Sequence, residues 1–165
     1  MKNVVILRGP SGAGKSTYIE KTFRGLNPKV CSADLFFVVP AQVASKPNLP
    51  VVRIDVRDDY VYDFDPTKLP EAHSDCMASF LGCILQEAPL IVLDNTNIRT
   101  FEYHNYMVLA KMHGYDVEIV EMVPETVDEL KMVISRNRHR VPADVICKMV
   151  LNFEPAEAAI RVPVQ

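Results

Sequence analysis

The sequence predicts an α/β fold of three layers, in which helices cover both faces of a parallel sheet. Apolar runs of strand length alternate with longer stretches of helical periodicity, which is typical of successive strand–helix–strand units. The chain has 165 residues, the length of one domain, and 48% of them are hydrophobic, which is enough for one substantial core. We therefore expect a single domain that covers residues 1–165.

Local sequence patterns predict where each strand and helix begins and ends, in chain order. Short apolar runs predict strands over residues 2–7, 29–33, 90–93 and 115–122. Helix-compatible stretches, several with apolar residues at three- and four-residue steps, predict helices over residues 16–24, 69–87, 100–113, 125–136 and 143–153. Pro70 suits the first turn of the second helix, and Gly114 is a natural stop after the third.

Residues 38–62 break this rhythm. Pro40, Pro47 and Pro50 interrupt the segment, and no periodicity is sustained through it. We expect an insertion that lies over the ligand-binding edge of the sheet.

The residues after the first strand fit the phosphate-loop pattern G-x-x-x-x-G-K-[ST] at every fixed position. They are Gly9, Pro10, Ser11, Gly12, Ala13, Gly14, Lys15 and Ser16, and Thr17 follows them. The glycines allow a tight path that turns backbone N–H groups toward phosphate oxygens, and the next helix adds its positive dipole end. Lys15 can reach the β- and γ-phosphates, while the Ser16 hydroxyl suits a Mg²⁺ ion. This predicts a P-loop NTPase fold that binds ATP, with GTP also possible.

Two aspartates directly follow predicted strands, Asp34 after the second and Asp94 after the third. Ligands of an open parallel sheet bind outside the carboxyl ends of its strands, so both carboxylates are expected beside the phosphate loop. There a carboxylate can accept the proton of a substrate hydroxyl, or hold Mg²⁺ directly or through water. The alternative for each aspartate is a helix N-cap or a turn.

A basic cluster holds Arg136, Arg138 and Arg140. Phosphoryl transfer needs positive charge against the transferring oxygens, and the planar guanidinium of arginine suits phosphate. We expect a lid over residues 136–142. The alternative is a solvated helix end whose basic side chains face the C-terminal dipole.

Composition and charge exclude several classes of protein. The net charge of −3 argues against general attraction to nucleic acid or anionic membrane, although a local basic cleft remains open. The four cysteines have neither C-x-x-C pairing nor the spacing of a zinc site. No apolar stretch approaches the ~20 residues of a membrane span. We expect a soluble, cytoplasmic protein with reduced cysteines.

The combined motifs resemble the polynucleotide-kinase-like branch of P-loop kinases, AAA-33-type ATP-binding domains that include phage polynucleotide 5′-hydroxyl kinases. Beyond the phosphate loop, the resemblance rests on Ser32-Ala33-Asp34, Tyr62-Asp63-Phe64-Asp65-Pro66, Ala72-His73, Asp94-Asn95-Thr96-Asn97 and Arg136-Asn137-x-His139-x-Val141-Pro142. It implies that Asp34 is the general base for a 5′-hydroxyl, that Lys15 and Ser16 contact phosphate, and that Asp94 shapes the acceptor site. It also implies lid contacts from Arg136 and from Arg138 or Arg140.

The chain departs from that family at three positions. Leu35 replaces a second acidic residue, Phe37 replaces an arginine that contacts substrate phosphate in phage members, and Arg140 stands where relatives often have glycine. Aromatic residues such as Phe36, Phe37, Tyr60 and Tyr62 could instead stack on nucleobases, or they could be ordinary packing.

The sequence thus predicts a Mg-ATP-dependent kinase acting on a hydroxyl, with the 5′-hydroxyl end of a polynucleotide as the expected acceptor and single-stranded nucleic acid 5′ ends as a partner to test. We assign catalysis to Asp34, Lys15, Arg136 and Arg138, and the acceptor side to Asp34, Phe37, Asp94, Thr96 and Asn97. The nucleotide side comprises the phosphate loop with Thr17, together with Arg136 and Arg140. Two alternatives stay open: a small-molecule or nucleotide kinase, and an ATP- or GTP-binding regulatory module without catalysis.

Overall fold

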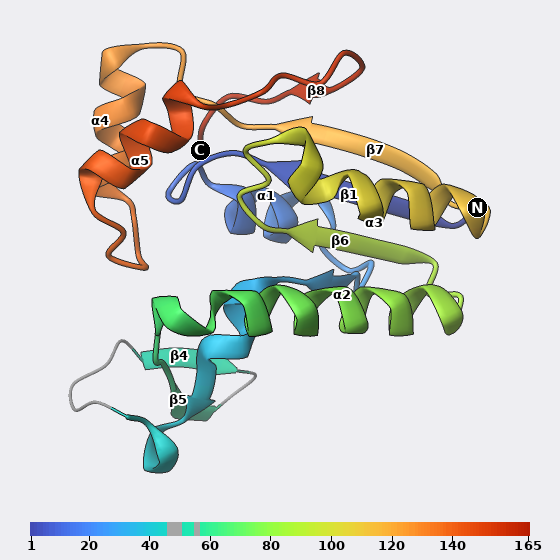
Figure 1. Cartoon of the computed structure of the whole chain (residues 1–165), viewed down its shortest axis with the longest axis horizontal. Coiled ribbons are helices and arrows are strands. Elements are labelled where there is room, and N and C mark those ends of the chain that lie inside the picture. Colours follow the sequence, from blue (N-terminus) through green and yellow to red (C-terminus); the bar gives the residue numbers. More distant parts are fainter. Residues whose placement is uncertain (46–50, 55–56) are drawn as a thin grey trace.

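The structure, a computed structural model, describes residues 1–45, 51–54 and 57–165 (Figure 1). Its main sheet has five strands in the order β2-β6-β1-β7-β8, and each neighbouring pair is parallel. These strands are β1 (Asn3–Arg8), β2 (Lys29–Cys31), β6 (Leu90–Asp94), β7 (Asp116–Glu121) and β8 (Ile160–Arg161). The helices are α1 (Lys15–Thr22), α2 (Leu69–Leu85), α3 (Thr100–Met112), α4 (Val127–Ser135) and α5 (Ala143–Leu151).

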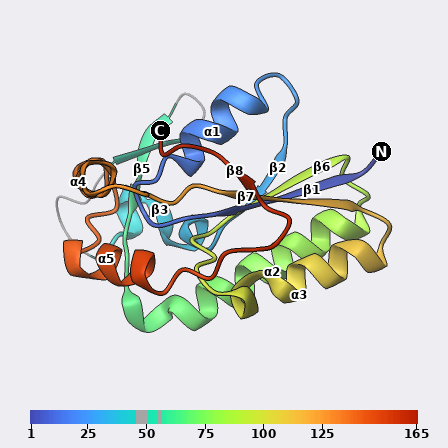
Figure 2. The same ribbon diagram turned by 90° about the horizontal axis from the view of Figure 1, so that it is seen from above.

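The helices cover the sheet on both faces, which confirms the predicted three-layer α/β fold. Figure 2 shows α1 on one face and α2 with α3 on the other. Successive side chains of a strand point to opposite faces, so β1 contributes to two cores. Val4 and Ile6 pack in the cluster that contains residues of α2 and α3, whereas Val5 and Leu7 pack in the cluster that contacts α1.

The second strand is shorter than predicted. It ends at Cys31, because the Ser32 hydroxyl accepts a hydrogen bond from the Asp34 N–H and begins a short 3-10 helix, Ala33–Phe37. β8 was not predicted, since its two residues, Ile160 and Arg161, are too few to show a periodicity. They extend the sheet by pairing with Val120 and Glu121 of β7.

The predicted insertion contains a small antiparallel sheet that the sequence pattern did not indicate. Its order is β3-β5-β4, formed by β3 (Val38–Pro40), β5 (Arg57–Tyr62) and β4 (Val51–Ile54). Pro40 is tolerated at the end of an edge strand, where its missing N–H costs no ladder bond. Residues 46–50 and 55–56 of the predicted insertion lie outside the described residues. Short 3-10 turns follow β3 (Ala41–Val43) and precede α2 (Pro66–Lys68).

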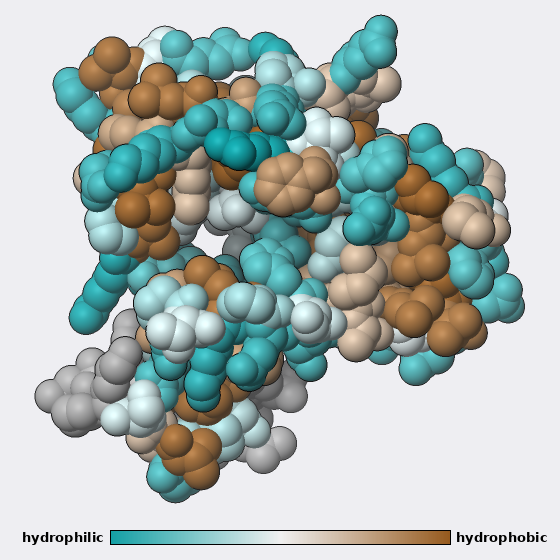
Figure 3. Space-filling view, in the orientation of Figure 1, coloured by the Kyte–Doolittle hydropathy of each residue, from teal (hydrophilic) through white to brown (hydrophobic). Residues whose placement is uncertain are grey.

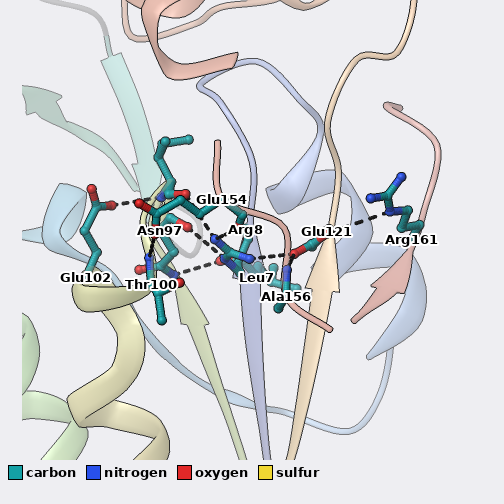
Figure 4. Close-up of polar contacts among 10 residues, drawn as sticks. Leu7, Arg8, Asn97, Thr100, Glu102, Glu121, Glu154, Ala156 and Arg161 are labelled. Atoms are coloured by element: carbon teal, nitrogen blue, oxygen red, sulfur yellow. Dashed lines mark hydrogen bonds and ion pairs between the residues drawn. The ribbon is translucent and has the colours of Figure 1, made fainter. Parts of the chain in front are cut away.

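A buried arginine joins three parts of the fold (Figure 4). Arg8, at the end of β1, is 0% exposed and pairs with Glu121 of β7. Its other donors reach the carbonyl oxygens of Asn97, Ile98 and Glu154, at 2.8, 3.1 and 2.7 Å. The guanidinium also lies 4.4 and 4.6 Å from the ring centres of Tyr103 and Phe153. This cluster fixes the segment after β6 against β1 and the segment after α5.

Among the described residues, no helix combines the length and apolar character that crossing a membrane requires.

Candidate active site

The phosphate loop turns tightly because its glycines occupy backbone conformations that other residues avoid. Gly9, Gly12 and Gly14 have φ values of 148°, 86° and 99°. A Cβ atom at Gly12 would lie 2.2 Å from the carbonyl oxygen of Val133 in α4, and one at Gly9 would lie 2.1 Å from that of Met122. The loop is therefore packed between the end of β7 and α4, with no space for a side chain at either position.

Lys15 lies folded back over the loop. Its ammonium donates to the carbonyl oxygens of Gly9 and Pro10, at 2.9 and 3.1 Å. Burial lowers the pKa of Lys15, while the negative charges of Asp94 and Asp34 act in the opposite direction. The ammonium group of Lys15 is buried, and the negative charge of a bound triphosphate would stabilise its charged form.

Asp94 and Ser16 form the oxygen pair expected for a magnesium site. The Ser16 hydroxyl donates to Asp94 Oδ2 at 3.5 Å, across the gap between the loop and the end of β6. Burial raises the pKa of Asp94, and Lys15 counteracts this shift. Mg²⁺ is commonly bound by one or two protein oxygens together with substrate phosphates and water, so this donor pair fits the ion.

Asp34 follows β2 in the 3-10 helix and faces the same space. Its Oδ1 accepts a hydrogen bond of 2.8 Å from the Tyr62 hydroxyl, and its Oδ2 lies 3.7 Å from His139 Nε2. Burial raises the pKa of Tyr62 well above its ordinary value, and the negative charge of Asp34 raises it further. Tyr62 therefore keeps its proton and acts as a permanent donor to the carboxylate.

The arginine segment, residues 136–142, connects α4 to α5 and lines the pocket. Asn137 fixes it: its Oδ1 accepts from the Ser11 hydroxyl at 3.1 Å, and its Nδ2 donates to the Val141 carbonyl oxygen at 2.6 Å. Arg136, Arg138 and Arg140 are exposed. Within the described parts of the chain, no hydrogen bond or ion pair engages their guanidinium groups. Three cations thus line the pocket.

These groups surround one pocket of about 1800 Å³. A typical small-molecule site has ~300–1,000 Å³, so this one has room for a nucleotide and an acceptor together. Figure 3 shows a hollow between the part formed by α4 and α5 and the part formed by the small sheet. The predicted residues that line it are Ser11, Gly12, Gly14, Lys15, Ser16, Thr17, Asp34, Asp94, Thr96, Asn97, Arg136, Arg138 and Arg140.

Phe37 corrects the predicted acceptor side. It is 2% exposed, and its ring lies edge-on to Phe36, Tyr62 and Phe64 at centroid distances of 5.3, 6.1 and 5.0 Å. It therefore belongs to the core beneath the small sheet and does not line the pocket. An arginine at this position would have to bury its charge, so the packing here suits Phe37.

Asn97 and Thr96 hold the segment after β6 against β1 and the phosphate loop. Asn97 is 2% exposed, and its Nδ2 donates to the Leu7 carbonyl oxygen at 2.8 Å. The Thr96 carbonyl oxygen accepts from the Gly9 N–H at 2.9 Å. The side chain of Asn97 is thus held against β1, while the residue still lines the pocket, and its assignment to the acceptor stays a prediction.

Sequence reasoning gave no role to two asparagines. Asn137 joins the arginine segment to the phosphate loop, and Asn95 accepts from the Ala33 N–H at 2.8 Å, which fixes the turn before Asp34. Both lie inside motifs already singled out, Asp94-Asn95-Thr96-Asn97 and Arg136-Asn137-x-His139. Their partners are distant in sequence, so the motif could indicate their importance but not their contacts.

A parallel sheet whose first strand leads into a Lys-Ser phosphate loop, with aspartates after neighbouring strands, defines a kinase-like P-loop domain. The model of the AAA domain family, of the AAA-33 type, matches residues 4–156, and the chain belongs to this family.

Individual proteins extend this comparison. Human NEDD4-binding protein 2 is 28% identical over 155 residues, a match covering 92% of this chain and 8% of that protein. The chain spans between 8% and 11% of the length of the curated relatives it matches. A gluconokinase from Sinorhizobium meliloti 1021 is 12% identical with a TM-score of 0.54, covering 98% of this chain and 82% of that one. The Mycobacterium tuberculosis APS kinase CysC, in complex with AMPPNP and APS, is 12% identical with a TM-score of 0.56, covering 98% and 88%.

Proposed function

We propose that this chain transfers the γ-phosphate of Mg-ATP to the 5′-hydroxyl end of a polynucleotide. The observation that carries the proposal is the position of Asp34: its carboxylate faces the same pocket as Lys15, Asp94 and the arginine segment. A nucleotide-binding module needs no such base opposite its phosphate site. A kinase does.

The nucleotide side would work through the backbone and two side chains. The loop N–H groups and the α1 N-terminus would hold the phosphates, and Lys15 would leave the carbonyl oxygens of Gly9 and Pro10 for the β- and γ-phosphates. Ser16 and Asp94 would hold Mg²⁺, which supplies charge neutralisation at the phosphates. Thr17 would contact the phosphates beside them.

The acceptor side would work through Asp34. The 5′-hydroxyl oxygen attacks the γ-phosphorus, the bond between that phosphorus and the β–γ bridging oxygen breaks, and ADP leaves. Asp34 accepts the hydroxyl proton. Arg136 and Arg138 stabilise the charge on the transferring oxygens, and Arg140 contacts the nucleotide.

One observation favours a small-molecule or nucleotide kinase as the second candidate. The wall beyond Asp34 is largely apolar and aromatic, with Phe64, Leu69 and Met77 among its residues. Bases can stack on such a wall, but a compact apolar or aromatic metabolite would fit it as well.

A labelling panel tests the proposal. The protein is incubated with γ-labelled ATP, or γ-labelled GTP, and with 5′-hydroxyl DNA, 5′-hydroxyl RNA, nucleosides and hydroxyl metabolites in parallel. Label on the nucleic-acid 5′ ends supports the proposal, and 5′-phosphorylated oligonucleotides are the matched control that should stay unlabelled. Label on a metabolite alone favours the second candidate. ATP binding without any labelled acceptor identifies a binding module.

A further inference from the structure

We propose that Tyr62, supplied by the small sheet, is a positioning residue that holds the Asp34 carboxylate in the orientation needed to accept the acceptor's proton. The inference rests on the proposed function, because it concerns how that function's base is aligned. It also gives the small sheet a task in the chemistry.

Asp34 needs an external support. It lies in a short 3-10 helix, its side chain is 53% exposed, and the hydrogen bond of its own N–H goes to Ser32. An exposed aspartate side chain rotates among several rotamers, of which few would place an oxygen at the incoming hydroxyl. Transfer therefore benefits from a partner that selects one orientation.

Tyr62 is built to be that partner. It ends β5, pairs with Val38 of β3, and is 6% exposed. Its ring packs edge-on to Phe37 and stacks on Phe64, both at 6.1 Å between centroids. A ring fixed by these neighbours places its hydroxyl at one point, 2.8 Å from Asp34 Oδ1.

The geometry divides the two carboxylate oxygens between two tasks. The Tyr62 hydroxyl donates to Oδ1, and Oδ2 lies 3.7 Å from His139 Nε2, so we assign the proton-accepting role to Oδ2. Lys15 and Asp94 are the other charges that act on this site. The buried Phe37 then has a clear role, since it supports the ring that aligns the base.

The test is a double-mutant cycle with Tyr62→Phe and Asp34→Asn. Tyr62→Phe keeps the packed ring and removes only the hydroxyl. We expect kcat to fall about 10-fold while the KM for ATP stays within about twofold. In the Asp34→Asn background, Tyr62→Phe should cause no further loss, because its effect passes through the carboxylate. The matched control is Tyr115→Phe, whose buried hydroxyl donates to the Ala88 carbonyl oxygen at 3.0 Å, and which should leave kcat unchanged.

The same variants are unfolded by urea without substrate, which tests the contact itself. Asp34→Ala takes the place of Asp34→Asn in this measurement, because an amide oxygen could still accept the Tyr62 hydroxyl. The shift in midpoint for the double variant Tyr62→Phe with Asp34→Ala should be smaller than the sum of the single shifts. Additive shifts overturn the inference whatever the acceptor is. So does a wild type that labels an acceptor while Tyr62→Phe keeps full kcat. A wild type that labels nothing defeats the proposed function, and the positioning role with it, whereas the first two outcomes leave the proposed function intact.

Discussion

The two sides of the pocket are built differently. The nucleotide side is mostly backbone: one loop, fixed by three glycines with positive φ and by the segment after β6. The proposed acceptor side consists of side chains from three separate segments: Asp34 after β2, Tyr62 from β5 and His139 from the arginine segment. A backbone site tolerates few substitutions, because a single Cβ at Gly12 would collide with α4. A site made of side chains can change its acceptor specificity through single substitutions, while the nucleotide site stays the same.

Arginine shows the same contrast. Arg8 is buried and fully engaged beneath the site, whereas Arg136, Arg138 and Arg140 are exposed around it. Burying a guanidinium costs several kcal/mol unless partners compensate, so Arg8 is expected to act on the fold and the exposed arginines on the ligand. Substitutions can separate these roles.

The largest effect is expected at Arg8. Arg8→Met leaves Glu121 without its buried cationic partner and with only the exposed Arg161, 3.9 Å away, so the free energy of unfolding should fall by about 3–5 kcal/mol, measured by urea denaturation. Both sides of the pocket should lose activity together. The double variant Arg8→Met with Glu121→Met is the control and should recover part of the loss, because it removes both charges. A single variant as stable as the wild type would show that this pair does not support the fold.

Lys15→Ala should act on the nucleotide side alone. It removes the charge that would follow the β- and γ-phosphates, so turnover should fall about 1000-fold and affinity for a non-hydrolysable ATP analogue should weaken. Folding should survive, because burial already disfavours the charged lysine. Isothermal titration checks the affinity. Unchanged binding would refute the assignment of the triphosphate site.

Asp34→Asn should act on the acceptor side alone. It keeps the shape and removes the proton acceptor, so kcat should fall by at least ~100-fold while ATP affinity stays nearly constant. Asp94→Asn is the informative companion, because it should instead raise the Mg²⁺ concentration needed for activity. Single-turnover transfer and ATP titration of both variants give the comparison. A near-normal rate for Asp34→Asn would mean that another group, or none, takes the proton.

The sequence predicts the phosphate loop better than the contacts around Asp34, and the reason is physical. The phosphate loop, the apolar run of β6 and the helices starting at Leu69 and Thr100 are encoded by neighbouring residues, and each was found at or near its predicted place. The Tyr62–Asp34 and Asn137–Ser11 contacts join residues 28 and 126 positions apart, and local periodicity contains no information on them. Phe37 was misassigned for the same reason, since its burial depends on the distant ring of Tyr62.

The smallest effects are expected in the arginine segment, where position distinguishes the three cations. Arg136→Ala and Arg138→Ala should each lower kcat about 10-fold and change ATP affinity less, because their charge matters most in the transition state. Arg140 has a φ of 55°, a conformation that favours glycine. Arg140→Gly should therefore relieve backbone strain while removing one charge, and kcat should stay within about threefold of wild type. Steady-state kinetics on the identified acceptor, over a range of ATP concentrations, measures all three variants. If Arg136→Ala and Arg138→Ala match Arg140→Gly, the segment is a solvated helix connection and the positive charge for transfer comes from Lys15 and Mg²⁺ alone.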